Sequence, residues 1–430
     1  MEQDRIWAEV DGLRDEMINV LRELVRRPSE NTPPTGNERA CQDFIAEYMR
    51  GLGLEVDIYT LADMPELFAH PSFLPGRDYS NRPNVTAIMA GSGGGRSLLL
   101  TGHVDTVPRG TVEWTKDPFG GEVEDGLLYG LGAEDMKGGL AAFMIAIRAL
   151  RELRVQLKSD LIFESVVDEE FGGVNGTIAG RLHGPPVDGA IIGEGTDLNI
   201  YPAARGCRIA HLFLQGPGSV LTVGEEKSEA GIIPEQIAYI LSRARDFNLL
   251  RRQSLKIPTL YESYADPVPV LLTKIVAGFW GTKEPITIPA DARMEIYWQT
   301  MPGEEKGKVE QQFLSWLDEL VKESPHLFPL PPRVEFFSRW MPGTQIDPEH
   351  ELVRILSRHA ENVLGRPPEV KGAPWPCDMF ALHQDFQTPA VAFGPKGGNA
   401  HAADEYVKLD EVLLCAKAIS SFALEWCGVA

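Results

Sequence analysis

The stretch R-S-L-L-L-T at residues 96–101 runs directly into G-H-V-D-T at 102–106. The apolar run predicts a strand, and a histidine and an aspartate follow at its carboxyl end. Further short apolar strands are predicted at 161–167, 190–193 and 390–393, and a long apolar helix at 137–153. Continuous apolar strands that alternate with helices predict an α/β fold, with a mixed or largely parallel sheet covered on both faces.

The middle third of the chain has a different pattern. Strands are predicted at 207–215, 271–279 and 292–300, and amphipathic helices at 234–248 and 305–323. A strand–helix–strand–strand–helix order is typical of a compact α+β unit that folds as its own layer. We therefore expect an inserted domain over residues 204–340, inside a larger discontinuous domain formed by residues 1–203 and 341–430.

Composition excludes several classes of protein. The 430 residues are 43% hydrophobic and 24% charged, which is typical of a globular chain and not of a disordered one. The formal net charge is −21, and such an acidic surface repels nucleic-acid phosphates and anionic lipids. We therefore expect neither nucleic acid nor a membrane as a partner.

The cysteines and the N-terminus bear on the compartment. Five cysteines are scattered without C-x-x-C spacing, which fits reduced thiols in a cytoplasmic protein. Apolar residues at steps of three and four over residues 6–24 predict an amphipathic helix and not a signal peptide. No apolar run reaches the ~18 residues that a membrane span needs. The expected location is the cytoplasm.

Histidines and acids gather where strands end. In open α/β sheets, ligands bind beyond the carboxyl ends of the strands. A single acid at such a position is usually solvated surface, but here four strand ends and one helix start all carry His, Asp or Glu. The residues that we expect to meet in one crevice as metal ligands are His103, Asp135, Glu170, Glu194 and His401.

Two imidazoles and three carboxylates suit a pair of divalent metal ions. Imidazole favours zinc-like ions, and a carboxylate can bridge two of them. We assign the bridge to Asp135, because an anion between two cations offsets their repulsion. His103 and His401 are then end ligands, and Glu170 and Glu194 complete the two shells. Zinc is the expected metal, with cobalt or manganese as alternatives.

Two further acids are expected to support this centre. Asp105 follows His103 by two residues, where it would hold the far ring nitrogen and raise the basicity of the imidazole. Glu169 adjoins the ligand Glu170 and should not coordinate in the same direction. We therefore expect Glu169 to act as the general base on a metal-held water and later to protonate the leaving group.

Five motifs resemble those of the M20 metallopeptidase family, which includes acetylornithine deacetylase, succinyl-diaminopimelate desuccinylase and aminoacylase. They are G-H-V-D-T-V-P at 102–108, Y-G-L-G-A-E-D-M-K-G-G at 129–139, D-E-E-F-G-G at 168–173, G-E-G-T at 193–196 and A-H-A-A-D-E-Y-V at 400–407. The resemblance implies a zinc-aminopeptidase-like catalytic domain with two zinc ions and Glu169 as general acid/base. It also implies a cis peptide bond after Asp135, and a lid domain that commonly makes a homodimer or a higher homo-oligomer.

The lid departs from the family pattern. Members usually carry a histidine in a G-x-x-x-H-S-type segment, and the corresponding stretch at 216–225 has none. The family's Asp-x-Arg before Pro-Gly-Glu corresponds to Tyr297-Trp298-Gln299, and the usual asparagine to Thr273. An arginine grips a substrate carboxylate bidentately, and a neutral glutamine does not.

Either another group supplies the missing donor, or the reaction passes through a different intermediate. Arg205 at the hinge and His211 on the first lid strand are the expected replacements for the missing donors, although His211 also fits an ordinary strand histidine. Gln299 and Tyr297 are the remaining expected contacts. Strand alternation sends Tyr297 and Trp298 to opposite faces of the lid sheet.

The leading hypothesis is a metal-dependent hydrolase that cleaves a C–N bond of a small molecule, most simply an amide, as an N-deacylase or amidohydrolase does. The missing lid histidine and arginine motivate one alternative, an aminohydrolase of an aromatic amine like the family's nitroanthranilate aminohydrolase. A dipeptidase or exopeptidase is a second alternative, and a non-catalytic metal-binding homologue is a third. The partner in each enzymatic case is a small-molecule substrate.

Overall fold

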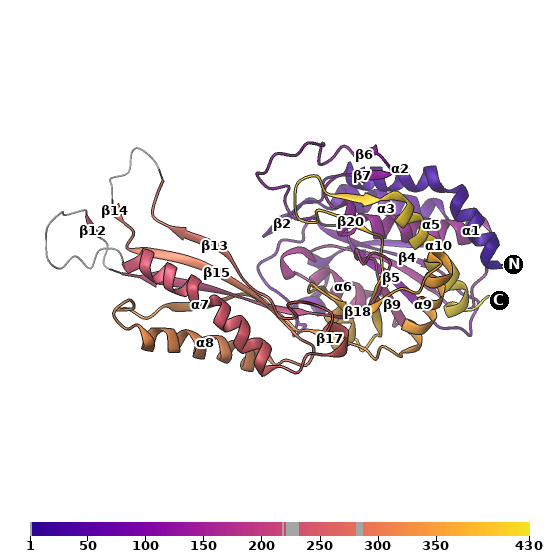
Figure 1. Ribbon diagram of the computed structural model, residues 1–430. Coiled ribbons are helices and arrows are strands. Elements are labelled where there is room, and N and C mark those ends of the chain that lie inside the picture. Colours follow the sequence, from indigo (N-terminus) through magenta and orange to yellow (C-terminus); the bar gives the residue numbers. More distant parts are fainter. Residues whose placement is uncertain (1, 217–218, 221–231, 281–286) are drawn as a thin grey trace. The chain divides into compact units, whose positions relative to one another are not determined.

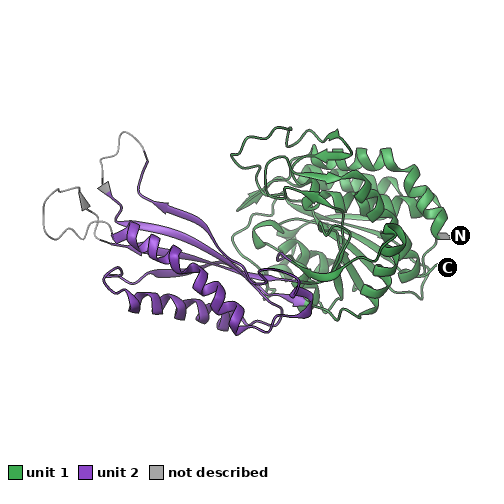
Figure 2. Ribbon diagram, in the orientation of Figure 1, with its two compact units in different colours: residues 1–203, 345–373, 377–430 green, residues 204–344, 374–376 purple. Residues whose placement is uncertain are grey.

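The computed structural model describes residues 2–216, 219–220, 232–280 and 287–430 (Figure 1). The chain divides into two compact units, which Figure 2 colours separately. Unit 1 comprises residues 1–203, 345–373 and 377–430, and unit 2 comprises residues 204–344 and 374–376. The boundaries expected from the sequence are 204 and 340.

A nine-stranded mixed sheet forms the centre of unit 1. Eight strands follow the order β17-β10-β19-β9-β5-β8-β4-β3, and β18 pairs with β10 outside this path. Their bounds are β3 Glu55–Thr60, β4 Pro83–Met89, β5 Leu98–His103, β8 Leu161–Val166, β9 Gly189–Ile192, β10 Ile200–Ala204, β17 Thr344–Gln345, β18 Val370–Ala373 and β19 Ala390–Ala392.

The directions of these strands position the site. β5 runs parallel to both β8 and β9, and β19 runs parallel to β9. The carboxyl ends of these four strands therefore lie at one edge of the sheet, as the sequence predicts. β4 is antiparallel to β8 and to β3, and β10 is antiparallel to β19. The expectation of an α/β fold with a mixed sheet is confirmed.

Helices in unit 1 differ in detail from the predicted ones. The expected helix over residues 6–24 is two helices, α1 and α2, which meet at Leu13. The bounds are α1 Glu2–Gly12, α2 Arg14–Val25, α3 Arg39–Gly51, α4 Pro65–Phe68, α5 Gly138–Glu152, α6 Asn175–His183, α9 Glu351–Leu364 and α10 Leu409–Cys427.

The almost wholly buried helix α5 begins beside the site. Its sequence G-G-L-A-A-F-M-I-A-I is apolar on every face, which is typical of a helix enclosed by protein. A Cβ atom on Gly139 would overlap the carbonyl group of Gly193. The glycine therefore lets the start of α5 lie directly against the end of β9, which brings the loop before α5 close to Glu194.

Short paired strands complete unit 1. One sheet has the order β20-β21-β7-β6, and a two-stranded ribbon joins β1 and β2. The bounds are β1 Asn31–Thr32, β2 Thr35–Gly36, β6 Glu122–Glu124, β7 Leu127–Tyr129, β20 Gly397–Gly398 and β21 Tyr406–Lys408. No helix among the described residues has the length and apolar character that crossing a bilayer requires.

Unit 2 is an antiparallel sheet with two long helices. The strand order is β13-β15-β11-β16, and a separate short pair joins β12 and β14. The bounds are α7 Ile232–Ser254, α8 Lys306–Glu323, β11 Gly206–Gln215, β12 Ser219–Val220, β13 Val270–Ala277, β14 Thr287–Ile288, β15 Asp291–Thr300 and β16 Arg333–Met341. The sequence analysis did not predict β16, whose exposed and half-buried residues alternate without a continuous apolar run.

Aromatic rings dominate the core of unit 2. Trp298 is fully buried and stacks on Phe313, with ring centroids 4.8 Å apart, while Phe247 meets Trp298 edge to face. Trp298 thus points into the helix-covered face of the sheet, and its neighbours Tyr297 and Gln299 face the other way, because side chains alternate along a strand.

Replacing Trp298 by alanine should destabilise unit 2. Loss of a buried tryptophan costs about 3–5 kcal/mol through lost burial and the cavity that remains. The matched control is Trp280→Ala, because the Trp280 side chain is fully exposed and its removal should change stability by no more than about 0.5 kcal/mol. Urea unfolding of both variants measures the difference, and equal unfolding midpoints would contradict the packing described here.

Candidate metal centre

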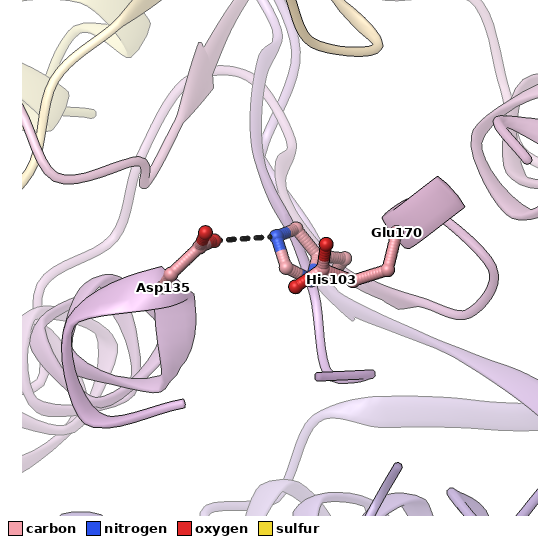
Figure 3. A group of neighbouring side chains, drawn as sticks. All are labelled: His103, Asp135 and Glu170. Carbon is pink, nitrogen blue, oxygen red and sulfur yellow. Dashed lines mark hydrogen bonds and ion pairs between the residues drawn. The ribbon is translucent and has the colours of Figure 1, made fainter. Parts of the chain in front are cut away.

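Five separate elements bring the predicted ligands together. His103 is the last residue of β5, Asp135 lies in the turn Ala133–Lys137 before α5, and Glu170 begins the turn Glu170–Gly172. Figure 3 shows these three side chains reaching toward one another. Glu194 follows β9 by two residues, and His401 lies between β20 and β21.

The carboxylate of Asp135 faces a different histidine with each oxygen. Its Oδ1 lies 3.0 Å from Nε2 of His103, and its Oδ2 lies 3.0 Å from Nε2 of His401. The peptide bond between Asp135 and Met136 is cis, as the family resemblance implies. Asp135 therefore has the placement that a bridging ligand requires.

Each histidine also meets one glutamate. The Nε2 atom of His103 lies 3.6 Å from Oε1 of Glu194, and Nε2 of His401 lies 3.2 Å from Oε2 of Glu170. The other oxygen of Glu170 accepts a hydrogen bond from the Val107 backbone N–H at 3.1 Å. The five side chains thus form two half-sites that share Asp135.

The histidines and carboxylates of this cluster shift one another's pKa values. Hydrogen bonds that His401 donates to the Asp135 and Glu170 carboxylates raise its pKa to about 11. Burial lowers the pKa of His103, but Asp135 and Glu194 outweigh it and raise this pKa well above its ordinary value. Burial, together with the charge of Asp135, raises the pKa of Glu194 to about 7. The carboxylates thus attract positive charge into the crevice.

The residues present fit divalent metal ions. Ligand atoms of His103, Asp135 and Glu170 all lie within 4.8 Å of one another, a spacing that suits coordination of a cation. Imidazole nitrogens and carboxylate oxygens are ligands that zinc and related ions accept. Because such ions bind the deprotonated groups, a metal would replace the protons that these histidines and carboxylates otherwise share.

Asp105 acts on the site through two of its groups. Its backbone carbonyl oxygen lies 2.8 Å from Nδ1 of His103, whereas its carboxylate lies 3.7 Å from that nitrogen. The carboxylate instead accepts hydrogen bonds from the backbone N–H groups of Glu169 at 3.2 Å and of Glu170 at 3.1 Å. The carbonyl group is therefore the nearer partner of the ring, and the carboxylate holds the neighbouring loop.

Glu169 lies on that loop, beside the predicted ligand Glu170. Burial raises the pKa of the Glu169 carboxyl well above its ordinary value, and the nearby charges of Glu194, Asp378 and Glu170 raise it further, against the opposing effect of His103. A carboxylate in such surroundings holds a proton readily, which suits a group that takes up and returns protons.

Glu405 supports the site in a way that the sequence analysis missed. Its carboxylate accepts hydrogen bonds from the backbone N–H groups of Gly132, Glu134 and Asp135, at 2.8, 2.9 and 3.0 Å. These bonds hold the turn that presents Asp135. Glu405 lies within the quoted motif at 400–407, but its sequence position alone does not distinguish it from the neighbouring Asp404.

In unit 2, three of the expected substrate contacts form one network. Gln299 Oε1 accepts a hydrogen bond from Arg205, while Gln299 Nε2 donates to the Tyr297 hydroxyl at 3.1 Å and to the Pro374 carbonyl at 2.9 Å. Arg205 is buried and lies over the rings of Tyr261 and Tyr264. The side chains of Arg205, Gln299 and Tyr297 thus hold one another in place.

His211 lies apart from that network, six residues along β11. Its Nε2 atom pairs with Glu295 Oε2 at 2.9 Å, and its ring stacks on Phe337. Thr273 also donates to Glu295, at 2.8 Å. His211 therefore has the contacts of an ordinary strand histidine. Most of the stretch at 216–225, where the family histidine is missing, lies outside the described residues.

Comparisons with known proteins agree with this geometry. Residues 99–425 match the model of Peptidase family M20/M25/M40. Proteins named N-formyl-4-amino-5-aminomethyl-2-methylpyrimidine deformylase, from Halalkalibacterium halodurans and Bacillus subtilis, are each 26% identical to the chain. The alignments cover 99% and 98% of this chain and 97% of each relative. A di-peptidase structure from Saccharomyces cerevisiae aligns with a TM-score of 0.76 at 15% identity, over 99% of this chain and 98% of that one.

The chain belongs to peptidase family M20/M25/M40, since the family model matches more than half of its length. It is a metal-dependent hydrolase that acts on C–N bonds. The family resemblance seen in the five motifs is thereby confirmed. The likeness to the yeast structure supports the fold alone.

Replacing Glu405 by glutamine should weaken metal binding. The change removes the charged acceptor that orients Asp135, and loss of such a supporting contact typically costs about 10–100-fold in metal affinity. Competition with a chromophoric chelator, with zinc as the probe, measures the affinity.

The matched control is Asp404→Asn. The Asp404 carboxylate also accepts three hydrogen bonds, but from Thr115 and Lys116 and not from the turn at Asp135. Its metal affinity should stay close to that of the unchanged chain. Equal losses in both variants would contradict the role given to Glu405.

Proposed function

We propose that this chain is an N-deformylase that hydrolyses the formamide of a small aminomethyl-substituted heteroaromatic amine. The products are formate and a primary amine. One observation carries the proposal: two relatives named as deformylases of such a compound match almost the whole chain. The convergence of the predicted metal ligands at the sheet edge supports it.

Two divalent metal ions would be held by the two half-sites. His103 and Glu194 would bind one ion, His401 and Glu170 the other, and Asp135 would bridge them. Such ions supply a water of lowered pKa and polarise the carbonyl group that it attacks. We propose zinc as the native metal, because two histidines and three carboxylates suit it, with cobalt and manganese as alternatives.

Glu169 would move the protons. It would take a proton from the attacking water and return it to the amine nitrogen as the C–N bond breaks. Burial raises the pKa of the Glu169 carboxyl, and this supports the assignment because it favours uptake of a proton from water. Asp105 would act by fixing the backbone that carries Glu169.

The residues of the lid favour a substrate that has no carboxylate. Gln299 stands where family members usually have an arginine, and its amide is already bonded to Arg205, Tyr297 and Pro374. A neutral amide lacks the charge-assisted grip on a carboxylate that an arginine provides. We therefore favour a neutral formamide over an N-acyl amino acid, with Arg205, Tyr297 and Gln299 shaping the lid.

The other functions considered from the sequence are less well supported. A dipeptidase or exopeptidase usually captures a terminal carboxylate, for which Gln299 is poorly suited. An arylamine aminohydrolase is not favoured by the full-length relatives, whose names denote an amide substrate. A non-catalytic protein would have little need to keep Glu169, which is not an expected ligand.

We also propose that the enzyme works in the cytoplasm. The five cysteines are all buried thiols outside any disulfide, which fits a protein of a reducing compartment. The proposed small-molecule substrate is consistent with this location, and the acidic composition argues against nucleic acid or an anionic membrane as a partner.

We further propose a homodimer formed through unit 2. β13 is an edge strand in the described sheet, and it exposes apolar side chains: Leu271, Ile275 and Val276 are 51%, 44% and 63% exposed. An exposed edge strand with apolar side chains is suited to pairing with another chain. A second copy of unit 2 would cover this edge.

Val276→Glu should convert the dimer to a monomer, because a buried unpaired carboxylate would oppose the interface. Size-exclusion chromatography with light scattering measures the mass. The control is Val112→Glu, which changes a valine of similar exposure (70%) in unit 1 and should leave the dimer intact. A monomeric unchanged chain, or a Val276→Glu variant that remains dimeric, would refute the proposed interface.

The proposed activity is tested by measuring formate. The zinc-loaded chain should release formate from N-formyl-4-amino-5-aminomethyl-2-methylpyrimidine far faster than it releases carboxylate from N-acetyl amino acids. Glu169→Gln should lower kcat by at least about 10²–10⁴-fold, the usual contribution of a general acid–base group, with the metal content unchanged.

Glu170→Gln provides the contrast, because loss of a ligand should reduce the metal content itself. Failure of the unchanged chain to release formate would overturn the deformylase assignment. Turnover retained by Glu169→Gln would overturn the role of Glu169 while leaving the substrate assignment standing.

A further inference from the structure

A segment from the N-terminal part of the chain lies against the loop that follows β5. The backbone N–H of Asn31 donates to Thr106 O at 2.8 Å, and Thr106 N–H donates to Ser29 O at 3.0 Å. The Ser29 hydroxyl donates to Val104 O at 2.7 Å. Residues 29–31 therefore pair with residues 104–106, just beyond the end of β5. This pairing places Asn31 beside the predicted metal ligands.

The side chain of Asn31 is fully buried between two loops that carry site residues. Its Nδ2 atom lies 2.9 Å from Asp105 Oδ2, 3.2 Å from Asp168 Oδ1 and 3.4 Å from the Glu170 carbonyl oxygen. The –NH₂ end of the amide faces these three acceptors, because an amide oxygen in the same place would meet only other oxygens.

The two carboxylates joined by Asn31 belong to different strand ends. Asp105 follows β5, and Asp168 follows β8. Asp168 also accepts from the Tyr79 hydroxyl and lies 3.4 Å from Arg77 Nε. Two buried carboxylates so close would repel each other, and the –NH₂ group of a neutral amide offers one hydrogen to each. Asn31 thereby sets how closely the two loops approach.

The loop after β8 needs such external support. Three of its non-glycine residues have left-handed backbone conformations: Asp168 with φ 64°, Phe171 with φ 59° and Val174 with φ 59°. Each costs of order 1–3 kcal/mol and persists only where the surrounding structure holds it. Hydrogen bonds from the backbone of Glu169 and Glu170 to Asp105, and from Asn31 to Glu170 O, provide that hold.

We propose that Asn31 is a positioning residue of the metal centre. It fixes the separation between the loop that follows His103 and the loop that carries Glu169 and Glu170, and so the distance from His103 to these two glutamates. The inference rests on the metal-ligand roles given under the proposed function. Asn31 itself touches neither metal nor substrate.

The test replaces Asn31 by leucine, which has a similar shape and no donor. The matched control is Gln42→Leu. Gln42 is equally buried and donates through Nε2 to the Ser165 carbonyl on β8 at 2.9 Å. Both variants lose one buried amide donor, but only Asn31 bonds to Asp105, Asp168 and the Glu170 backbone.

Two quantities are measured on each variant: zinc affinity by chelator competition, and kcat and KM for formate release from the N-formyl pyrimidine. Asn31→Leu should lose about 10–100-fold in zinc affinity and in kcat, with KM changed by less than about three-fold. Gln42→Leu should keep zinc affinity and kcat within about three-fold of the unchanged chain, because the Gln42 side chain donates to the Ser165 carbonyl and not to either loop of the site.

Zinc affinity and kcat retained by Asn31→Leu would overturn the proposal, and so would equal losses in Gln42→Leu. If Asn31→Leu does not fold, Asn31→Ala, which also lacks the donor and is less bulky, is judged by zinc affinity and kcat with the same limits. Failure of the proposed function is recognised separately, because the unchanged chain would then bind no zinc or release no formate.

Discussion

The structure depends on one carboxylate that faces two imidazoles. Asp135 offers Oδ1 to His103 and Oδ2 to His401, each at 3.0 Å, and one glutamate lies beyond each histidine. Two cations at this spacing would repel each other strongly in a buried site unless an anion lay between them. Under the proposed function, the shared carboxylate would be what lets a single crevice hold a pair of metal ions.

Hydrogen bonds from backbone N–H groups also hold the turns that carry the site residues. Glu405 accepts three N–H groups from the turn around Asp135, and Asp105 accepts two from the loop of Glu169 and Glu170. The close contact of Gly139 with the end of β9 brings these turns to one sheet edge. A change in any of these supports is expected to act on the metal centre without touching a ligand.

Strong local patterns made part of this molecule predictable. The apolar strands around His103 and the acids that follow them predicted the parallel centre of the sheet and the set of residues that converge there. Asn31 and Glu405 were not predicted, because their roles arise from bonds to residues more than 70 positions away. In unit 2, β16 has no continuous apolar run, since only one face of that edge strand packs on the core.

The central claim is that two ions share Asp135. The most direct test is anomalous diffraction at the zinc edge from crystals of the zinc-loaded chain. Two zinc peaks are expected on opposite sides of the Asp135 carboxylate, one beside His103 and Glu194 and the other beside His401 and Glu170. A single peak, or peaks that do not contact Asp135, would contradict this claim.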